Sequence, residues 1–162
     1  MTGNALRVRT SLILHEEELS KLAEKFLNQD SIRNIQTSTG LFTTAESINN
    51  CGRYPERNDT PWTCNVGEYP NTTSINLSDI NAVLEYEHIP KDEYQYYVEF
   101  LRTYKFNGLG KDSNNRSVDL EDKSRGLRYY EQQNSDNFGE NSEYLFVKKI
   151  SKNWFYYVRD WN

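Results

Sequence analysis

The clearest periodicity in the chain predicts an amphipathic helix over residues 15–28. Apolar residues recur there at the spacing of one helical face, namely Leu19, Leu22, Ala23, Phe26 and Leu27. Glutamates crowd the first turn of this segment, where negative charge suits the helix dipole. Residues 5–14, just before it, alternate loosely between apolar and polar, so we expect a strand or an extended lead-in there.

Two further helices are predicted in the middle of the chain. Ser78 suits the N-cap of the first, which has Asp79 in its first turn. Pro90 breaks that helix and can occupy the first turn of the second. We expect residues 107–108, an Asn-Gly pair, to end the second helix in left-handed geometry. One apolar face of the second helix is predicted to consist of Tyr94, Tyr97, Val98 and Leu101.

The last third of the chain alternates with a period of two and predicts strands. The strands are expected over residues 118–120, 126–131, 144–150 and 154–161. Residues 151–153 supply a short turn, so residues 143–161 are predicted to form an antiparallel hairpin. Both faces of this hairpin carry aromatic side chains, which indicates that its strands are central in a sheet or covered on both sides.

The stretch between the first helix and the helix pair is less regular. Residues 32–48 favour a strand, whereas residues 49–77 are punctuated by proline and glycine and predict a long loop. A loop of this length is either functional, held by the two cysteines, or partly a strand around residues 63–66. We therefore expect a single α+β domain over residues 1–162, with an N-terminal helix and a central helix pair packed on a C-terminal antiparallel sheet of three to five strands.

Composition narrows the possible partners. Only 36% of the 162 residues are apolar, but 12 Tyr, 7 Phe and 3 Trp can anchor a core. A net charge of −5 disfavours binding to a phosphate backbone, so we expect no nucleic acid partner. The densest basic group, Lys148, Lys149 and Lys152, is interpreted as a solvated strand face. No apolar stretch reaches about 18 residues, so we expect no membrane insertion.

The two cysteines are predicted to form a disulfide. Cys51 and Cys64 lie 13 positions apart in the irregular segment, where a disulfide would stabilise the fold by about 3 kcal/mol. A disulfide requires an oxidising compartment, so this prediction favours an extracytoplasmic location, either periplasmic or secreted. The alternative is a pair of thiols in a reducing cytosol. Neither a second cysteine pair nor a nearby histidine indicates zinc.

No motif predicts catalysis. The two histidines, His15 and His88, fall at expected helix ends, where histidine often serves the helix itself. Residues 108–113 superficially resemble a phosphate-binding loop, but a helix is expected before them and a polar turn after them. We interpret them as a helix C-cap and loop. We therefore predict no catalytic residue, no metal ligand and no cofactor.

Carboxylates are numerous, and one group of them invites a second interpretation. Asp119, Glu121 and Asp122 could gather with Asp112 around calcium. Their spacing matches no known calcium-binding loop, so we expect them to be solvated acids. A pair of acids facing each other across a cleft would instead indicate a hydrolase.

The surplus of aromatic residues carries the functional prediction. Tyrosines at 129, 130, 156 and 157 place a ring on each face of the sheet. Five more tyrosines lie on or near the helix pair, namely Tyr86, Tyr94, Tyr96, Tyr97 and Tyr104, and we expect that not all nine can be buried in a domain of this size. Exposed tyrosine and tryptophan are favoured anchors in protein interfaces. The predicted binding residues are Tyr86, Tyr96, Tyr129, Tyr157 and Trp161.

These observations together predict a non-catalytic protein-binding module, with an inhibitor-like or toxin-neutralising role as one form. The acidic average charge would steer a basic partner toward it. Two alternatives stay open. A small hydrolase would place a carboxylate pair in a concave pocket, and a carbohydrate-binding module would present coplanar exposed rings on one sheet face.

Overall fold

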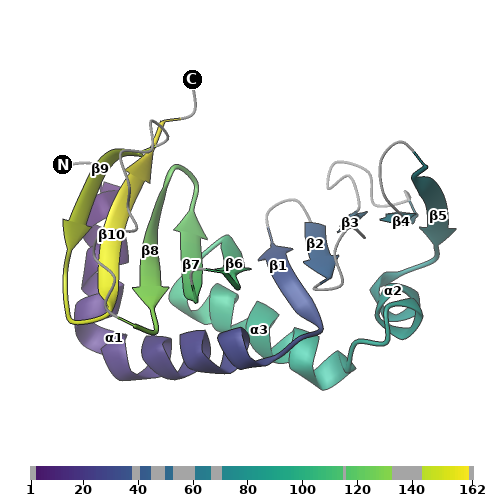
Figure 1. Cartoon of the computed structure of the whole chain (residues 1–162), viewed down its shortest axis with the longest axis horizontal. Coiled ribbons are helices and arrows are strands. Elements are labelled where there is room, and N and C mark those ends of the chain that lie inside the picture. The colour runs from purple at the N-terminus through teal and green to yellow at the C-terminus, as the bar shows by residue number, and fades with distance from the viewer. Residues whose placement is uncertain are drawn as a thin grey trace.

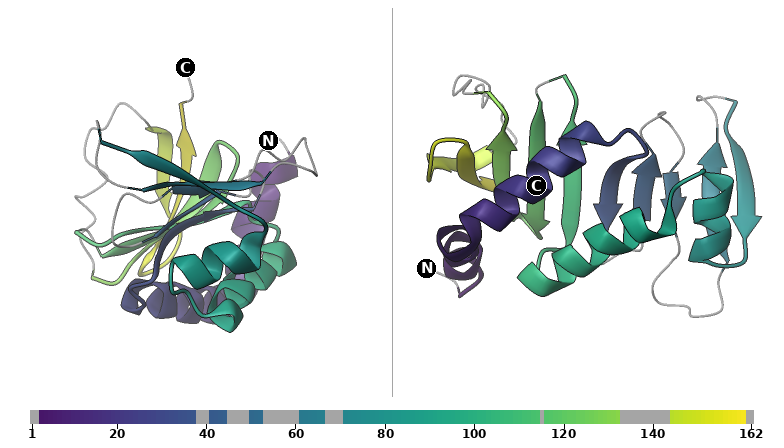
Figure 2. Two further views of the ribbon diagram at one scale, coloured as in Figure 1. Left: turned by 90° about the vertical axis from the view of Figure 1, so that its right-hand side faces the viewer. Right: turned by 90° about the horizontal axis from the view of Figure 1, so that it is seen from below.

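Three helices and ten antiparallel strands make up the described part of the chain, which comprises residues 3–37, 41–44, 50–52, 61–66, 71–114, 116–132 and 144–160 of a computed structural model. The helices lie on one side of a single continuous sheet, and the other side of the sheet carries no helix of this part of the chain (Figures 1 and 2). The α+β class, with a helix at the N-terminus and strands at the C-terminal end, is therefore confirmed.

The helices are α1 (Gly3–Asn28), α2 (Ile80–Tyr86) and α3 (Lys91–Tyr104). The strands are β1 (Ile32–Gln36), β2 (Leu41–Thr44), β3 (Asn50–Gly52), β4 (Trp62–Val66), β5 (Thr73–Leu77), β6 (Gly108–Asp112), β7 (Ser117–Asp122), β8 (Arg125–Tyr130), β9 (Tyr144–Lys149) and β10 (Trp154–Arg159).

The strands are arranged in the order β5-β4-β3-β2-β1-β6-β7-β8-β10-β9. The first five strands form one run of neighbours, and β1 joins that run to β6. At the far end the last hairpin folds back, so that β10 pairs with β8 and β9 becomes the outermost strand. The C-terminal region supplies β6 to β10, and β7 to β10 correspond to the four strands predicted there. The sheet continues into five more strands from the first half of the chain.

Helix α1 is longer than predicted. Residues 5–14 are helical and not an extended lead-in, because Val8 and Leu12 are buried and continue the apolar face of residues 15–28. The two halves of α1 meet at His15, whose backbone leaves helical geometry (φ −136°, ψ 28°). The His15 ring there contacts the ring of Tyr104 on α3, with 5.0 Å between ring centroids. The five predicted core residues of the second half are all buried.

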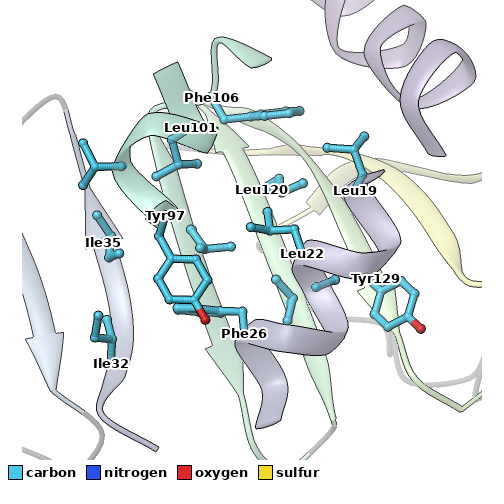
Figure 3. Packing of buried hydrophobic residues seen from close by; sticks show 14 of the residues in the cluster. Leu19, Leu22, Phe26, Ile32, Ile35, Tyr97, Leu101, Phe106, Leu120 and Tyr129 are labelled. Atoms are coloured by element: carbon cyan, nitrogen blue, oxygen red, sulfur yellow. The ribbon is translucent and has the colours of Figure 1, made fainter. Parts of the chain in front are cut away.

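The core lies between the helices and the sheet (Figure 3). Leu22 and Phe26 point from α1 toward Leu120 and its neighbours on the sheet. The Phe26 ring meets the Tyr97 ring of α3 edge to face, with 5.0 Å between centroids. Burying each such large side chain stabilises the fold by roughly 1.5–3 kcal/mol. This packing joins α1 and α3 into one layer over the sheet.

The ends of the helix pair differ from the prediction by a residue or two. The N-cap of α2 is Asp79, not Ser78, because the Asp79 side chain accepts hydrogen bonds from two backbone N–H groups of the first turn. Helix α3 starts directly after Pro90, which is its N-cap and not part of its first turn, and it buries Tyr97, Val98 and Leu101. It ends at Lys105 in left-handed geometry, and the Asn-Gly pair expected there leads directly into β6.

The segment predicted as a long loop contains three strands, β3, β4 and β5. The alternative of a strand near residues 63–66 is correct, since β4 covers them. Cys51 on β3 pairs directly with Cys64 on β4, and the predicted disulfide joins them with 4.1 Å between the Cα atoms. Residues 32–48 contain two strands instead of one. These strands are too short, and too often interrupted, for alternation to predict them.

Residues 108–113 also differ from their interpretation as a helix cap and loop. Five of them form β6, a strand in the middle of the sheet between β1 and β7. No helix among the described residues is long and apolar enough to cross a membrane.

Candidate functional site

The outermost strand β9 exposes large apolar side chains. Leu145 is 67% exposed and Phe146 is 49% exposed. Within the described sheet, β9 has one neighbour, β10. The register between the two strands shifts near Val158, which leaves Leu145 without a partner on β10. Unpaired strand edges are templates for pairing with another chain, and exposed apolar residues strengthen that tendency.

The strand behind this edge is closely packed and buried. Residues 154–157 of β10 are all buried, so aromatic rings cover both faces of the strand. On the helix side, the Phe146 ring meets the Tyr156 ring with 6.2 Å between centroids. On the other side, the rings of Tyr144 and Tyr157 meet with 5.5 Å between centroids. Edge-to-face pairs of this kind add about 0.5–1.5 kcal/mol beyond their buried area.

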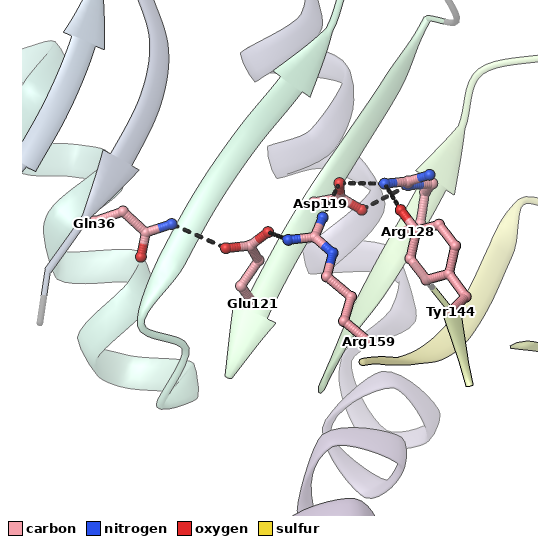
Figure 4. A network of polar contacts seen from close by, with 6 residues as sticks. All are labelled: Gln36, Asp119, Glu121, Arg128, Tyr144 and Arg159. Atoms are coloured by element: carbon pink, nitrogen blue, oxygen red, sulfur yellow. Dashed lines mark hydrogen bonds and ion pairs between the residues drawn. The ribbon is translucent and has the colours of Figure 1, made fainter. Parts of the chain in front are cut away.

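A network of charged and polar side chains runs across the helix-free face of the sheet to β9 (Figure 4). Arg128 donates two hydrogen bonds to the Asp119 carboxylate, at 2.7 and 2.6 Å. The same guanidinium donates to the Tyr144 hydroxyl at 2.8 Å. These contacts connect β7 through β8 to the edge strand.

The network continues toward the middle of the sheet. Arg159 on β10 donates to Glu121 at 2.6 Å and approaches Asp119 at 3.4 Å. The Gln36 side chain on β1 donates to Glu121 at 2.9 Å. Bidentate arginine–carboxylate pairs are strong and directional, so they fix the relative positions of the strands that carry them.

Most of the network is screened from water. The side chains of Asp119 and Arg128 are 16% and 15% exposed, and those of Glu121 and Arg159 are 18% and 21% exposed. Burial alone lowers the pKa of the Arg128 guanidinium, but the hydrogen bonds and the charge of Asp119 raise it well above its ordinary value. Burial also raises the pKa of the Tyr157 hydroxyl well above its ordinary value. At neutral pH the arginine is charged and the tyrosine neutral.

Gly126 lies beneath the Tyr157 ring and allows the ring to pack closely against the sheet. A Cβ atom at Gly126 would lie 2.5 Å from Cζ of Tyr157 and 2.7 Å from the backbone oxygen of Leu120. Because a backbone atom cannot give way as a flexible side chain can, position 126 accepts only glycine without a shift of the strand. The close approach helps to bury the Tyr157 ring.

Helix α1 adds further apolar surface at this end of the molecule. Its first half lies at the same end as β9 and β10, on the helix side of the sheet (Figures 1 and 2). Leu6, Ile13 and Leu14 on this half are each more than 60% exposed. Five of the seven large apolar side chains that are exposed in the described residues therefore belong to β9 or to this part of α1.

The chain matches no family model, no curated protein and no solved structure. Its function is therefore argued from the geometry of its own residues.

The predicted binding tyrosines lie in different parts of the fold. Tyr86 at the end of α2 is 41% exposed, and Tyr96 on α3 is 38% exposed beneath the ammonium group of Lys25. Tyr129 and Tyr157 are buried. The structure does not bring these residues together in one surface, and their role in binding stays a prediction. Trp161 lies outside the described residues.

As expected, not all of the nine tyrosines on the helix pair and the sheet are buried: Tyr86 and Tyr96 are exposed, whereas the four sheet tyrosines are not. Tyr129, Tyr130, Tyr156 and Tyr157 are each at most 4% exposed. Two layers accommodate them: the helices cover one face, and on the other face the rings pack on each other and beneath arginines. The Tyr129 hydroxyl reaches the helix side and donates to Glu24 at 2.9 Å.

The acids of β7 are not the solvated group that the sequence predicts. Asp119 and Glu121 are part-buried acceptors of arginine hydrogen bonds. Asp122 points to the opposite face, where it pairs with Arg7. Alternation along a strand separates the three acids between two faces, so they do not gather around one cation.

The geometry of the described residues bears on both alternative functions. An open pocket of about 340 Å³ includes Asp119 and Glu121, as a hydrolase would require. Both carboxylates, however, already accept hydrogen bonds from Arg159 or Arg128. A carbohydrate-binding module needs exposed rings, whereas the rings of Tyr130, Phe155 and Tyr157 on this face are buried.

One group of possible metal ligands involves the disulfide. Cys51, Cys64 and Glu87 place ligand atoms within 4.8 Å of one another. A metal would require thiolates, and the disulfide leaves neither sulfur in that form. In the oxidised protein the two cysteines therefore serve as a structural crosslink beside α2.

The exposed edge was missed by sequence analysis. The hairpin itself was predicted correctly. The expectation that both of its strands are central or covered on both sides holds for β10 but is wrong for β9, which is outermost and exposes Leu145 and Phe146. Which strand of the hairpin lies outside depends on β10 pairing with β8, which no local pattern indicates.

Proposed function

We propose that this chain is a non-catalytic protein-binding module that docks an extended segment of a partner protein along the outer edge of β9, which pairs with no strand of the described residues. The observation that carries the proposal is the exposure of Leu145 and Phe146 on an outermost strand. A segment added beside β9 gains main-chain hydrogen bonds, and its side chains contact alternate residues of the strand. The exposed apolar pair supplies anchors for that contact.

The edge is already ordered before a partner arrives. Tyr144 is held by Arg128, Phe146 rests beside Tyr156, and β10 behind them is buried. Ordering side chains on binding costs roughly 0.5–1.5 kcal/mol for each one immobilised, so a strand held in this way loses less free energy on association.

Charge along the strand indicates the chemistry of the partner. Lys148 and Lys149 are exposed at the C-terminal end of β9, whereas the residues at its N-terminal end are apolar or aromatic. We propose a segment with apolar residues opposite Phe146 and acidic residues opposite the lysines. The overall charge had predicted a basic partner, but opposite charges directly across strands act at shorter range. An inhibitor-like or toxin-neutralising protein needs only such binding and no catalytic residue.

Photo-crosslinking from the edge tests the proposal. A photoreactive phenylalanine analogue is placed at Leu145 in one protein and at Ser74 on β5 in a matched control, and each is irradiated in an extract of the native cells. We expect a partner adduct from position 145 and not from position 74. The purified partner is then titrated by calorimetry against the wild type and against Phe146→Lys. The substitution should weaken binding at least tenfold, or about 1.4 kcal/mol.

Three results would overturn the proposal: equal adducts from both positions, an adduct that contains only a second copy of this chain, or undiminished affinity in Phe146→Lys. Circular dichroism of the variants shows that they are folded. Because Phe146 is half exposed, its substitution should leave the fold intact.

A further inference from the structure

A basic pocket lies apart from the β9 edge. It has a volume of about 600 Å³ and is formed where the C-terminal end of α3 meets the first half of α1 and the turn between β7 and β8. Its charged lining residues are Arg7, Arg102, Lys105, Lys123 and Asp122. Four cations against one carboxylate give the lining a net charge of +3, in a chain whose overall charge is −5.

Part of this lining is fixed by contacts within the protein. Arg7 donates to the backbone oxygen of Lys105 at 2.9 Å and forms an ion pair with Asp122, which is 4% exposed. The Asn107 side chain donates to the same carboxylate at 3.3 Å. Arg7 and Asp122 therefore neutralise each other and join α1 to the end of α3.

The remaining three cations of the lining are not neutralised by contacts of this kind within the described residues. Arg102, Lys105 and Lys123 are exposed, and none of them forms an ion pair or a side-chain hydrogen bond with a described residue. Three unneutralised positive charges around one pocket repel each other. A multiply charged anion bound in the pocket would stabilise them.

The backbone at the two lysines strengthens this interpretation. Lys105 and Lys123 both have left-handed geometry, with φ of 59° and 57°. Glycine is the favoured residue for this conformation at a helix end and adopts it without a steric penalty. A side chain held there at some cost in strain indicates a role for that side chain.

The dipole of α3 does not account for the whole cluster. Cations near a helix C-terminus offset a charge of about −0.5, which explains a preference for Arg102 or Lys105. It does not explain Lys123, which lies on the turn after β7. The half charge of the helix end is also small beside the net charge of the pocket.

We infer that this pocket binds the phosphate group of a small molecule. A phosphate monoester or a diphosphate carries two or three negative charges and matches the unneutralised cations, whereas a single carboxylate does not. Lysine and arginine are the usual partners of phosphate oxygens. The volume falls within the range of about 300–1,000 Å³ that is common for small-molecule sites. This binding is independent of the β9 edge.

Calorimetric titration with inorganic pyrophosphate and with inorganic phosphate tests the inference. We expect the wild type to bind both, and pyrophosphate more tightly, with affinity that falls as salt is added. Lys105→Gly and Lys123→Gly should each weaken pyrophosphate binding about tenfold, the loss of roughly one charge-assisted contact. Lys105→Arg should retain binding, and Lys91→Gln, a lysine at the other end of α3, should leave it unchanged.

The glycine variants separate binding from folding. Because glycine suits the left-handed positions, both variants should unfold at the same temperature as the wild type or higher. Weaker binding by a protein of undiminished stability would support the site. The inference is overturned if the wild type binds no pyrophosphate at millimolar concentration, if both glycine variants bind as the wild type does, or if malonate, a dicarboxylate, binds as tightly as phosphate.

Discussion

The two outermost strands of the sheet expose different chemistry. On β5, Ser74 and Asn76 hydrogen-bond to polar side chains of β4, and no large apolar residue is exposed. On β9, Leu145 and Phe146 are exposed, and only the two lysines at its C-terminal end discourage pairing with the strand of another chain. Polar and charged residues are the usual protection of sheet edges. One edge of the same sheet is thus protected along its length and the other only in part, which is why we propose β9, and not β5, as the binding edge.

The two ends also differ in what stabilises them. The β9 end depends on buried aromatic rings and on the arginine–carboxylate network. The β5 end has shorter strands and a small contact with α2, and the Cys51–Cys64 disulfide crosses it. We therefore expect the two ends to lose structure under different conditions.

The largest effect is expected from Trp154→Ala. Trp154 is fully buried on β10, meets the Tyr129 ring with 5.2 Å between centroids, and donates to the Ser20 hydroxyl at 3.0 Å. Truncating a buried tryptophan leaves a cavity and costs about 3–5 kcal/mol. Urea denaturation should show this loss of unfolding free energy.

Trp62→Ala on β4 is the matched substitution at the other end. Trp62 is 8% exposed, so its truncation should cost less. Amide hydrogen exchange should show early loss of protection in β8 and β10 for the first variant, and in β3 to β5 for the second. Identical exchange patterns would show that the sheet unfolds as one unit and would remove the distinction between its ends.

Elements with strong internal periodicity could be predicted from the sequence. The apolar face of α1 over residues 15–28, the face of α3 and the C-terminal hairpin all appear in the structure as expected. β6 was missed because Gly108 and Gly110 are signals of a turn. Its strand geometry comes from pairing with β1 and β7 on either side, and such tertiary context overrides local preference.

The site could be predicted only in part, because its contacts are distant in sequence. Asp119 and Glu121 are alternating acids of one strand, and nothing near them indicates arginine partners. Arg159, which bonds to Glu121, lies 38 positions away. The glycine that Tyr157 requires beneath its ring lies on a different strand, β8. Fold class follows from local patterns, whereas the partners of each functional side chain follow from strand order.

An intermediate effect is expected when the disulfide is removed. The Cys51→Ala/Cys64→Ala variant should lose about 3 kcal/mol in the chain-entropy model, since the crosslink closes a short loop. Hydrogen exchange should show the loss mainly in β3, β4 and β5. Reduction of the wild type with dithiothreitol should reproduce the pattern, and the variant should not respond to the reagent. Equal loss of protection in β7, β8 and β10 would contradict the separation of the two ends.

The smallest effect concerns the cap of α2, the helix that packs on β4 and β5. The Asp79 carboxylate accepts hydrogen bonds from the Ala82 and Asn81 backbone N–H groups at 3.0 and 2.8 Å. The bond from Ala82, with a smaller contribution from Asn81, lowers the pKa of Asp79 below its ordinary value of 3.8. Because the folded pKa is the lower one, the stabilisation is fully present above the ordinary pKa and is lost as pH falls through the folded value.

Replacing Asp79 by asparagine separates this charge effect from capping itself. Asparagine caps helices about as well as aspartate but does not titrate, so Asp79→Asn should lose less stability than the wild type on acidification below about pH 4. Thermal unfolding at pH 7 and at pH 3 gives the comparison, and other acids cancel because both proteins share them. Asp79→Ala removes the cap and should be less stable at both pH values. If the wild type and Asp79→Asn respond equally to acid, the ionised carboxylate adds nothing to the stability of α2 beyond the cap itself.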